Sequence, residues 1–256
     1  MDESFQTVYQ RLEARMKALA DDDRTVFVPN PVPAAPVDYL FVCMEPSLGR
    51  WARSAVDARA RLDEGFKNFL ESVETSIFHY CIRHYLCGST ERYHLTDLSK
   101  GAMLVEDAGI ARIQRYDRWY PLLQDEIELV ASKDAMIIGV GGEVYRYLNE
   151  KSSGERVSGR ILRTVMHYSD QAGRARSKGI SGHEQEFEAF KNSVTLEDVR
   201  ATAEDVIKDA CVPPKIKERV LLRLKENCLT LSRQRLMFNY KMRFESLRNE
   251  KSRFKT

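Results

Sequence analysis

Four short segments with the pattern of strands, separated by stretches of helical periodicity, constrain the fold of this chain more than any other feature. Aliphatic and aromatic residues dominate two of them, Val37–Val42 and Ala135–Val140, which is typical of strands buried on both faces of a sheet. Because strands alternate with helices, we predict an α/β fold in which right-handed crossovers build a three-layer αβα arrangement around a four-stranded, mainly parallel sheet. The four predicted strands are Val37–Val42, Tyr93–Leu98, Ala135–Val140 and Arg160–His167.

Helical periodicity precedes the first of these segments and fills the intervals between the others. An amphipathic helix opens the chain, with Phe5, Tyr9, Leu12 and Met16 on one face. Pro121 is expected in the first turn of its helix, where the missing amide hydrogen costs nothing. The remaining predicted helices are Ser54–Ser72, Ser76–Leu86, Pro121–Ser132, Glu143–Asn149 and His183–Asn192.

The chain changes character after Asn192, where helical patterns continue without a further strand. We therefore predict an α/β domain over residues 1–192 and a basic helical extension over 193–256. Two apolar stripes would pack this extension on the body: Leu221, Leu224, Cys228 and Leu231, and then Leu236, Tyr240, Phe244 and Leu247.

Charge is distributed unevenly along the chain. The segment from Pro213 to Thr256 holds thirteen lysines and arginines against four glutamates, a net charge of +9, whereas the whole chain carries +2 and the remainder therefore −7. A basic extension on an acidic body favours an anionic partner, with nucleic acid first. The alternative is a solvated basic helix face.

Composition argues against several classes of protein. No apolar run reaches the roughly 18 residues that a membrane span needs, and the polar start lacks a signal-peptide core. The five cysteines include no C-x-x-C pair, which argues against a zinc or iron–sulfur site and favours a reducing compartment. We expect a cytoplasmic monomer with no metal or other cofactor and no membrane association.

Three of the predicted strands end in ionisable side chains, namely Glu45, Asp97 and His167. Ligands of open α/β sheets bind at the carboxyl ends of the strands. Two carboxyls and a histidine at one such edge are the components of an acid/base or electrostatic site. Taken singly, each residue also fits a structural role, as a turn, a cap or a partly buried histidine. Their shared position at the sheet edge favours function.

The first of these segments resembles a motif of the uracil-DNA glycosylase superfamily. Cys43–Gly49 is similar to the family's Gly-x-(Asp/Asn)-Pro-(Tyr/Gly) loop, and Glu45 stands where the family has its water-orienting Asp or Asn. Leu95–Lys100 resembles the strand that ends in the family's base-reading Asn, with Asp97 at that position.

The resemblance extends over residues 37–192 in the family's order. Ile137–Gly142 is similar to the strand before the last motif, and His167–Ser169 resembles that motif, His-Pro-Ser. The chain departs from the family at Cys43 and Ser47, at Tyr168 in place of Pro, and at Asp97.

This resemblance implies a monofunctional DNA N-glycosylase that acts on a flipped-out nucleotide. Glu45 would orient water and stabilise the sugar cation, and His167 would donate a hydrogen bond to the departing base. The implied base pocket consists of Asp97, Trp51, Met44 and Tyr80, and the implied phosphate contacts are Ser47, Ser169, Lys100, Arg174, Arg176 and Lys178. Gln171 would be the wedge that fills the vacated stack. A Schiff-base role for Lys100 is the less favoured reading of that residue.

Asp97 suggests which base would be excised. An ionised carboxylate only accepts hydrogen bonds, which suits the exocyclic amino group of cytosine better than the edge of uracil. We therefore expect excision of cytosine or a modified cytosine from DNA, with exclusion of phage DNA as one possible purpose. The alternatives are ordinary uracil repair and a nucleic-acid-binding protein without catalysis.

Overall fold

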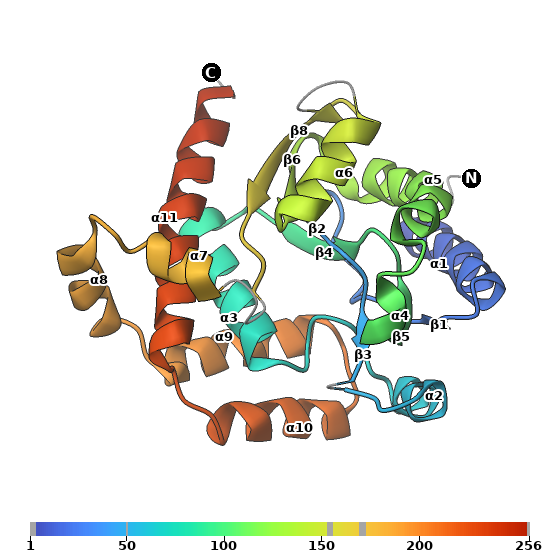
Figure 1. The fold of residues 1–256 in the computed structure, drawn as a ribbon, viewed down its shortest axis with the longest axis horizontal. Helices are drawn as coiled ribbons and strands as arrows, with labels where there is room; N and C mark the ends of the chain where they lie inside the picture. Colours follow the sequence, from blue (N-terminus) through green and yellow to red (C-terminus); the bar gives the residue numbers. More distant parts are fainter. Residues whose placement is uncertain (1–3, 50, 153–155, 169–172, 255–256) are drawn as a thin grey trace. The chain divides into compact units, whose positions relative to one another are not determined.

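The computed structural model describes residues 4–49, 51–152, 156–168 and 173–254, and the chain divides into two compact units. We call Met1–Asn68 with Glu91–Thr164 the sheet unit, and Phe69–Thr90 with Val165–Thr256 the helical unit. Figure 1 shows the elements of both. The chain therefore does not divide at residue 192 as predicted, because segments from its middle join the C-terminal helices.

A five-stranded, mostly parallel sheet forms the centre of the sheet unit, in the order β4-β2-β6-β8-β7. Strand β2 (Val37–Cys43) lies between β4 (Tyr93–Asp97) and β6 (Ala131–Val140) and is parallel to both. Strand β8 (Arg160–Val165) follows, and β7 (Arg156–Val157) pairs with it antiparallel at the edge. All four predicted strands are present, although β6 begins at Ala131 and not at Ala135, and β8 ends at Val165 and not at His167. Strand β7 is an addition.

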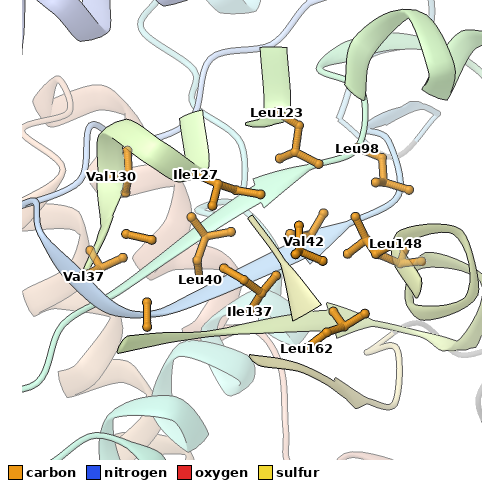
Figure 2. Close-up of a cluster of buried hydrophobic side chains, with 14 of the residues drawn as sticks. Val37, Leu40, Val42, Leu98, Leu123, Ile127, Val130, Ile137, Leu148 and Leu162 are labelled. Carbon is orange, nitrogen blue, oxygen red and sulfur yellow. The ribbon is translucent and has the colours of Figure 1, made fainter. Parts of the chain in front are cut away.

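One face of this sheet packs against helices in a buried apolar cluster (Figure 2). Leu40 and Val42 of β2 lie on that face beside Ile137 of β6, and Ile127 and Leu148 come from the helices that cover it. The covering helices are α1 (Phe5–Asp22), α5 (Arg112–Val130) and α6 (Gly142–Lys151). The cluster holds β2 firmly, so the residues that follow β2 start from a rigid position.

The rest of the sheet unit surrounds the segment that follows β2. A small second sheet has the order β1-β5-β3, and its β3 (Ser47–Leu48) comes directly after Pro46. The other elements here are β1 (Val26–Phe27), β5 (Gly101–Leu104), α2 (Ala55–Asp63) and α4 (Val105–Ala108).

Two helix predictions in the sheet unit need correction. The helix expected over Ser54–Ser72 ends at Asp63, and residues 64–72 form turns. The helix expected to start at Pro121 begins at Arg112, so Pro121 lies inside it. A proline commonly marks the first turn of a helix, but α5 continues on both sides of Pro121 because its neighbouring turns pack in the core.

The helical unit is built around its last and longest helix, α11 (Leu231–Phe254). The second predicted stripe, Leu236, Tyr240, Phe244 and Leu247, is fully buried, and the ring of Phe78 packs 5.0 Å from that of Tyr240. In the first stripe only Leu224 is similarly buried, and Leu231 is exposed. The helices of this unit before α11 are α3 (Val73–Cys81), the π-helix η1 (Ile82–Leu86), α7 (Gly173–Lys178), α8 (Glu184–Lys191), α9 (Leu196–Asp209) and α10 (Pro214–Lys225).

Candidate active site

The carboxyl ends of β2 and β4 bring two acidic side chains to one edge of the sheet. Cys43 of β2 is in register with Asp97 of β4. The two chains stay paired past the strands, since the amide of Leu98 donates to the carbonyl of Cys43 at 2.8 Å and that of Ser99 to Met44 at 3.3 Å. Glu45, the next residue after Met44, therefore lies beside the end of β4, and the expected convergence of Glu45 and Asp97 is present.

Glu45 is held by three side chains from the start of α5, which we call the Arg112–Tyr116 clamp (Arg112, Arg115 and Tyr116). Its side chain is only 4% exposed. Oε1 lies 3.2 Å from Nη2 of Arg112 and 3.9 Å from Nη2 of Arg115, and the hydroxyl of Tyr116 donates to Oε2. The carboxylate of Glu45 thus has two guanidinium groups and a hydroxyl donor as its partners.

The clamp itself is fixed by the turn before α5. Nε of Arg112 and Nη2 of Arg115 both donate to the carbonyl of Ala108, at 3.1 and 2.7 Å, and Nη1 of Arg115 donates to Ile110 at 3.1 Å. Sequence reasoning missed these residues because it started the helix at Pro121. The available signal was their spacing, since positions 112, 115 and 116 lie on one face of a helix.

Asp97 has a different environment from Glu45. It is 3% exposed, and its Oδ2 accepts a hydrogen bond of 2.8 Å from the amide of Asn68. Burial raises the pKa of Asp97 to about 8; Lys100 and Asn68 oppose this shift, while Glu126 and Glu45 add to it. Asp97 is therefore largely a neutral carboxylic acid near pH 7.

A buried polar cluster lies beside β4 and includes Lys100. Nζ of Lys100 lies 2.7 Å from Oε1 of Glu126, and both side chains are almost completely buried. Thr96 donates to Oε2 of Glu126 at 2.7 Å, and His94 and Tyr9 lie 3.3 and 3.2 Å from Oε1. Burial alone would raise the pKa of Glu126, but Lys100 and His94 together bring it below its ordinary value.

This arrangement corrects the predicted phosphate contact at Lys100. Its ammonium is 1% exposed and already paired with a carboxylate, so it offers no donor at the surface. The same burial disfavours a Schiff-base role. The lysine was assigned to phosphate because it follows a strand end, but its side chain turns into the core to compensate Glu126.

The other predicted pocket residues of the sheet unit are arranged around Pro46. Trp51 is half-buried, stacks on Phe66 with ring centroids 4.3 Å apart, and donates from Nε1 to the carbonyl of Ser47 at 2.9 Å. Met44 is half-buried against the main apolar cluster, and Ser47 is exposed. Ser47 is therefore accessible, and its contact with phosphate stays a prediction. One face of the Trp51 ring is occupied by Phe66.

His167 belongs to the helical unit, as does Tyr80. Burial, aided by the positive charge of Arg176, lowers the pKa of His167 to about 4, so its imidazole is neutral at pH 7. Its ring stacks on that of Tyr168, with centroids 4.5 Å apart. Tyr80 is buried and stacks on His84 at 4.2 Å. The convergence of these two residues with Glu45 and Asp97 stays a prediction.

Among the remaining predicted contacts, Arg176 is corrected. It is 1% exposed, and its guanidinium donates to the carbonyl of Tyr168 at 2.6 Å and to Oγ of Ser232 at 2.9 Å. It therefore links Tyr168 to α11 and is not available to phosphate. Lys178 is exposed, as expected of a phosphate contact. Ser169, Gln171 and the side chain of Arg174 lie outside the described residues.

No protein-family model matches the chain, and no curated protein matches it. Within the described residues, no group of three or more His, Cys, Asp or Glu side chains is arranged to hold a metal ion. No helix among them is both long and apolar enough to cross a bilayer.

Proposed function

We propose that this chain is a monofunctional DNA glycosylase that hydrolyses the N-glycosidic bond of a flipped-out cytosine or modified cytosine. One observation carries the proposal. Two carboxyls at neighbouring strand ends have opposite surroundings, with Glu45 beside two arginines and Asp97 buried beside an amide. A carboxyl that contacts cations, beside a buried carboxyl bonded to a neutral amide, is typical of sites that use one as an anion and the other as an acid.

Glu45 is the residue that faces the sugar in this proposal. As the bond between C1′ and the base breaks, positive charge develops on the sugar, and a fixed carboxylate stabilises that charge. The Arg112–Tyr116 clamp holds Glu45 in one orientation, so no reorganisation is needed during the reaction. The remaining lone pairs of the carboxylate orient the water that attacks C1′.

His167 is proposed to act on the departing base. A histidine with a pKa of about 4 is neutral at pH 7 and still carries one ring N–H. That N–H can donate a hydrogen bond to the developing charge on O2 of the base. Trp51, Met44 and Tyr80 remain the proposed walls of the base pocket.

The proposal also includes the layer arrangement of the fold and the cellular compartment. Tyr39 and Phe41 on one face of β2, and Leu40 and Val42 on the other, are all fully buried, which supports a sheet that forms the middle layer of a three-layer αβα arrangement. We place the protein in the cytoplasm as a monomer that binds DNA. The proposed biological role is the exclusion of foreign DNA that contains modified cytosine.

Two alternatives stay open. A largely neutral Asp97 can donate as well as accept, so the edge of uracil also fits it, and uracil repair is the first alternative. The second is binding of nucleic acid without catalysis, for which the basic C-terminal segment is the supporting feature.

An abasic-site assay tests the proposal. Single- and double-stranded oligonucleotides with one uracil, cytosine, 5-hydroxymethylcytosine or glucosylated 5-hydroxymethylcytosine are incubated with the protein and then treated with alkali. We expect strand breaks only after alkali, on one or more of the cytosine-type substrates. Breaks on uracil alone would establish the repair alternative, and no break on any substrate with DNA binding intact would establish the non-catalytic one.

A further inference from the structure

The two carboxyls of the site differ in what compensates their charge. Glu45 contacts both guanidinium groups of the clamp. Among the described residues, the one hydrogen-bond donor to Asp97 is a neutral amide, that of Asn68. Lys100, whose positive charge lowers the pKa of Asp97, is already paired at 2.7 Å with Glu126, and the negative charges of Glu126 and Glu45 raise that pKa. A carboxyl buried to 3% exposure without its own counter-ion is more stable as the neutral acid.

Asn68 also distinguishes the two oxygens of Asp97. Its amide donates to Oδ2, so Oδ2 is fixed as an acceptor and the proton belongs on Oδ1. The backbone amide of Asn68 donates to the carbonyl of Pro29 at 2.9 Å, which holds Asn68 itself in place. A carboxylic acid fixed in this way presents one donor and one acceptor side by side.

We propose that Asp97 is the general acid of the reaction, which transfers its proton from Oδ1 to ring nitrogen N3 of a cytosine-type base, and that Asn68 is the positioning residue that fixes it. This inference rests on the proposed function and explains why the substrate would be a cytosine-type base. Cytosine presents an acceptor at N3 and a donor at its exocyclic amino group, which match Oδ1–H and Oδ2 in that order. Uracil already carries a hydrogen at N3, so it can pair with this edge of Asp97 but cannot take the proton at that nitrogen.

The step is balanced in atoms and charge. The bond between C1′ and N1 breaks, and its electron pair passes into the base. The proton from Asp97 moves to N3, so the base leaves as a neutral tautomer and Asp97 becomes a carboxylate. Water adds its hydroxyl to C1′, and the proton it releases restores Asp97 through solvent. The pKa of about 8 supports this cycle, because the acid form is present at neutral pH and is regained readily.

The Asp97→Asn variant separates proton transfer from base recognition. An amide in place of the carboxyl still donates to N3 and accepts from the amino group, but it cannot transfer a proton. On the cytosine-type substrate that the wild type cleaves, we expect kcat to fall about 100-fold or more, the range that general acids contribute, with KM nearly unchanged. Any activity on uracil should fall far less.

The pH profile gives a second readout that a purely structural residue would not affect. The wild-type kcat/KM should decline above about pH 8 as Asp97 ionises in the free protein, and Asp97→Asn should lack this decline. The hydrogen bond from Asn68 lowers the pKa of Asp97, so Asn68→Ala should move the decline to higher pH. Thermal unfolding of each variant shows whether it is folded.

The outcomes separate this inference from the function on which it rests. A protein that cleaves no substrate disproves both. A wild type that cleaves a cytosine-type base, with Asp97→Asn retaining near-full kcat or losing cytosine and uracil activity equally, overturns the general acid alone. In that case Asp97 is a recognition residue, as the family resemblance alone implies.

Discussion

Lys100 shows how strongly the role of one residue depends on the depth of its side chain. In the sequence it follows a strand end, where a lysine commonly meets phosphate, and in the structure it compensates the buried Glu126. Glu45 and Asp97 were predictable because a strand pattern fixes where a strand stops. Asn68 was not, because the sequence does not show which distant side chain a fold brings to a strand end. The spacing of the Arg112–Tyr116 clamp could be read from the sequence, but its contact with Glu45 could not.

The Lys100→Met variant tests the structural role. Methionine fills much of the same volume but leaves Glu126 buried without its cation, and breaking a buried pair in this way costs about 3–5 kcal/mol of unfolding free energy. Urea denaturation measures the loss. The matched control is Lys178→Ala, at an exposed site, with little expected effect. Unchanged stability of Lys100→Met, combined with weaker DNA binding, would restore the phosphate role.

At the scale of elements, the strands were easier to predict than the helices. The apolar runs of β2 and β6 are long enough and sufficiently rich in aliphatic residues to allow only a buried strand. The start of α5 is hard to predict because the apolar residues there do not mark its buried face. Ile110 and Ile113 are 67% and 58% exposed, so the apolar pattern is weak at this end of the helix. Pro121 then suggested a start nine residues too late.

Pro121→Ala tests what the proline costs α5. Its side chain is exposed, and alanine would restore an amide that can donate to the carbonyl of Asp117 one turn earlier. The regained bond outweighs the greater freedom of the unfolded chain, so we expect a gain of roughly 1–2 kcal/mol in unfolding free energy. Chemical denaturation measures it, with Gln114→Ala in the first turn as the control. A loss of stability would mean that the helix is built around the proline.

At the scale of the whole molecule, the C-terminal helices are not the separable appendage that the sequence suggested. Helix α11 forms the core of a unit that also includes Val73–Leu86 from the middle of the chain. Part of the basic charge of the C-terminal segment is also used within the unit, since Arg219 and Arg223 of α10 pair with the buried Glu71, and Arg233 of α11 pairs with Glu74. Such pairings between distant segments leave no local signal in a sequence.

The DNA-binding role of this basic segment is therefore better tested by substitution than by truncation. Lys217 and Lys225 on α10 are exposed, and replacing both by alanine removes charge without removing core. If both contact phosphate, the slope of log affinity against log salt concentration should fall by about 2. The control is Lys17→Ala with Lys133→Ala, two exposed lysines of the sheet unit. An unchanged slope for the α10 pair would leave these lysines without a role in binding.

The central claim is that the edge formed by β2 and β4 breaks the bond between a cytosine-type base and DNA. Mass spectrometry of the free bases released from cytosine-modified and uracil-containing DNA tests it most directly, with Glu45→Gln as the matched variant that keeps shape and loses charge. We expect the wild type to release intact cytosine or modified cytosine, and Glu45→Gln to release it at least ~100-fold more slowly while still binding DNA. Release of no base by the wild type, or equal release by Glu45→Gln, would contradict the claim.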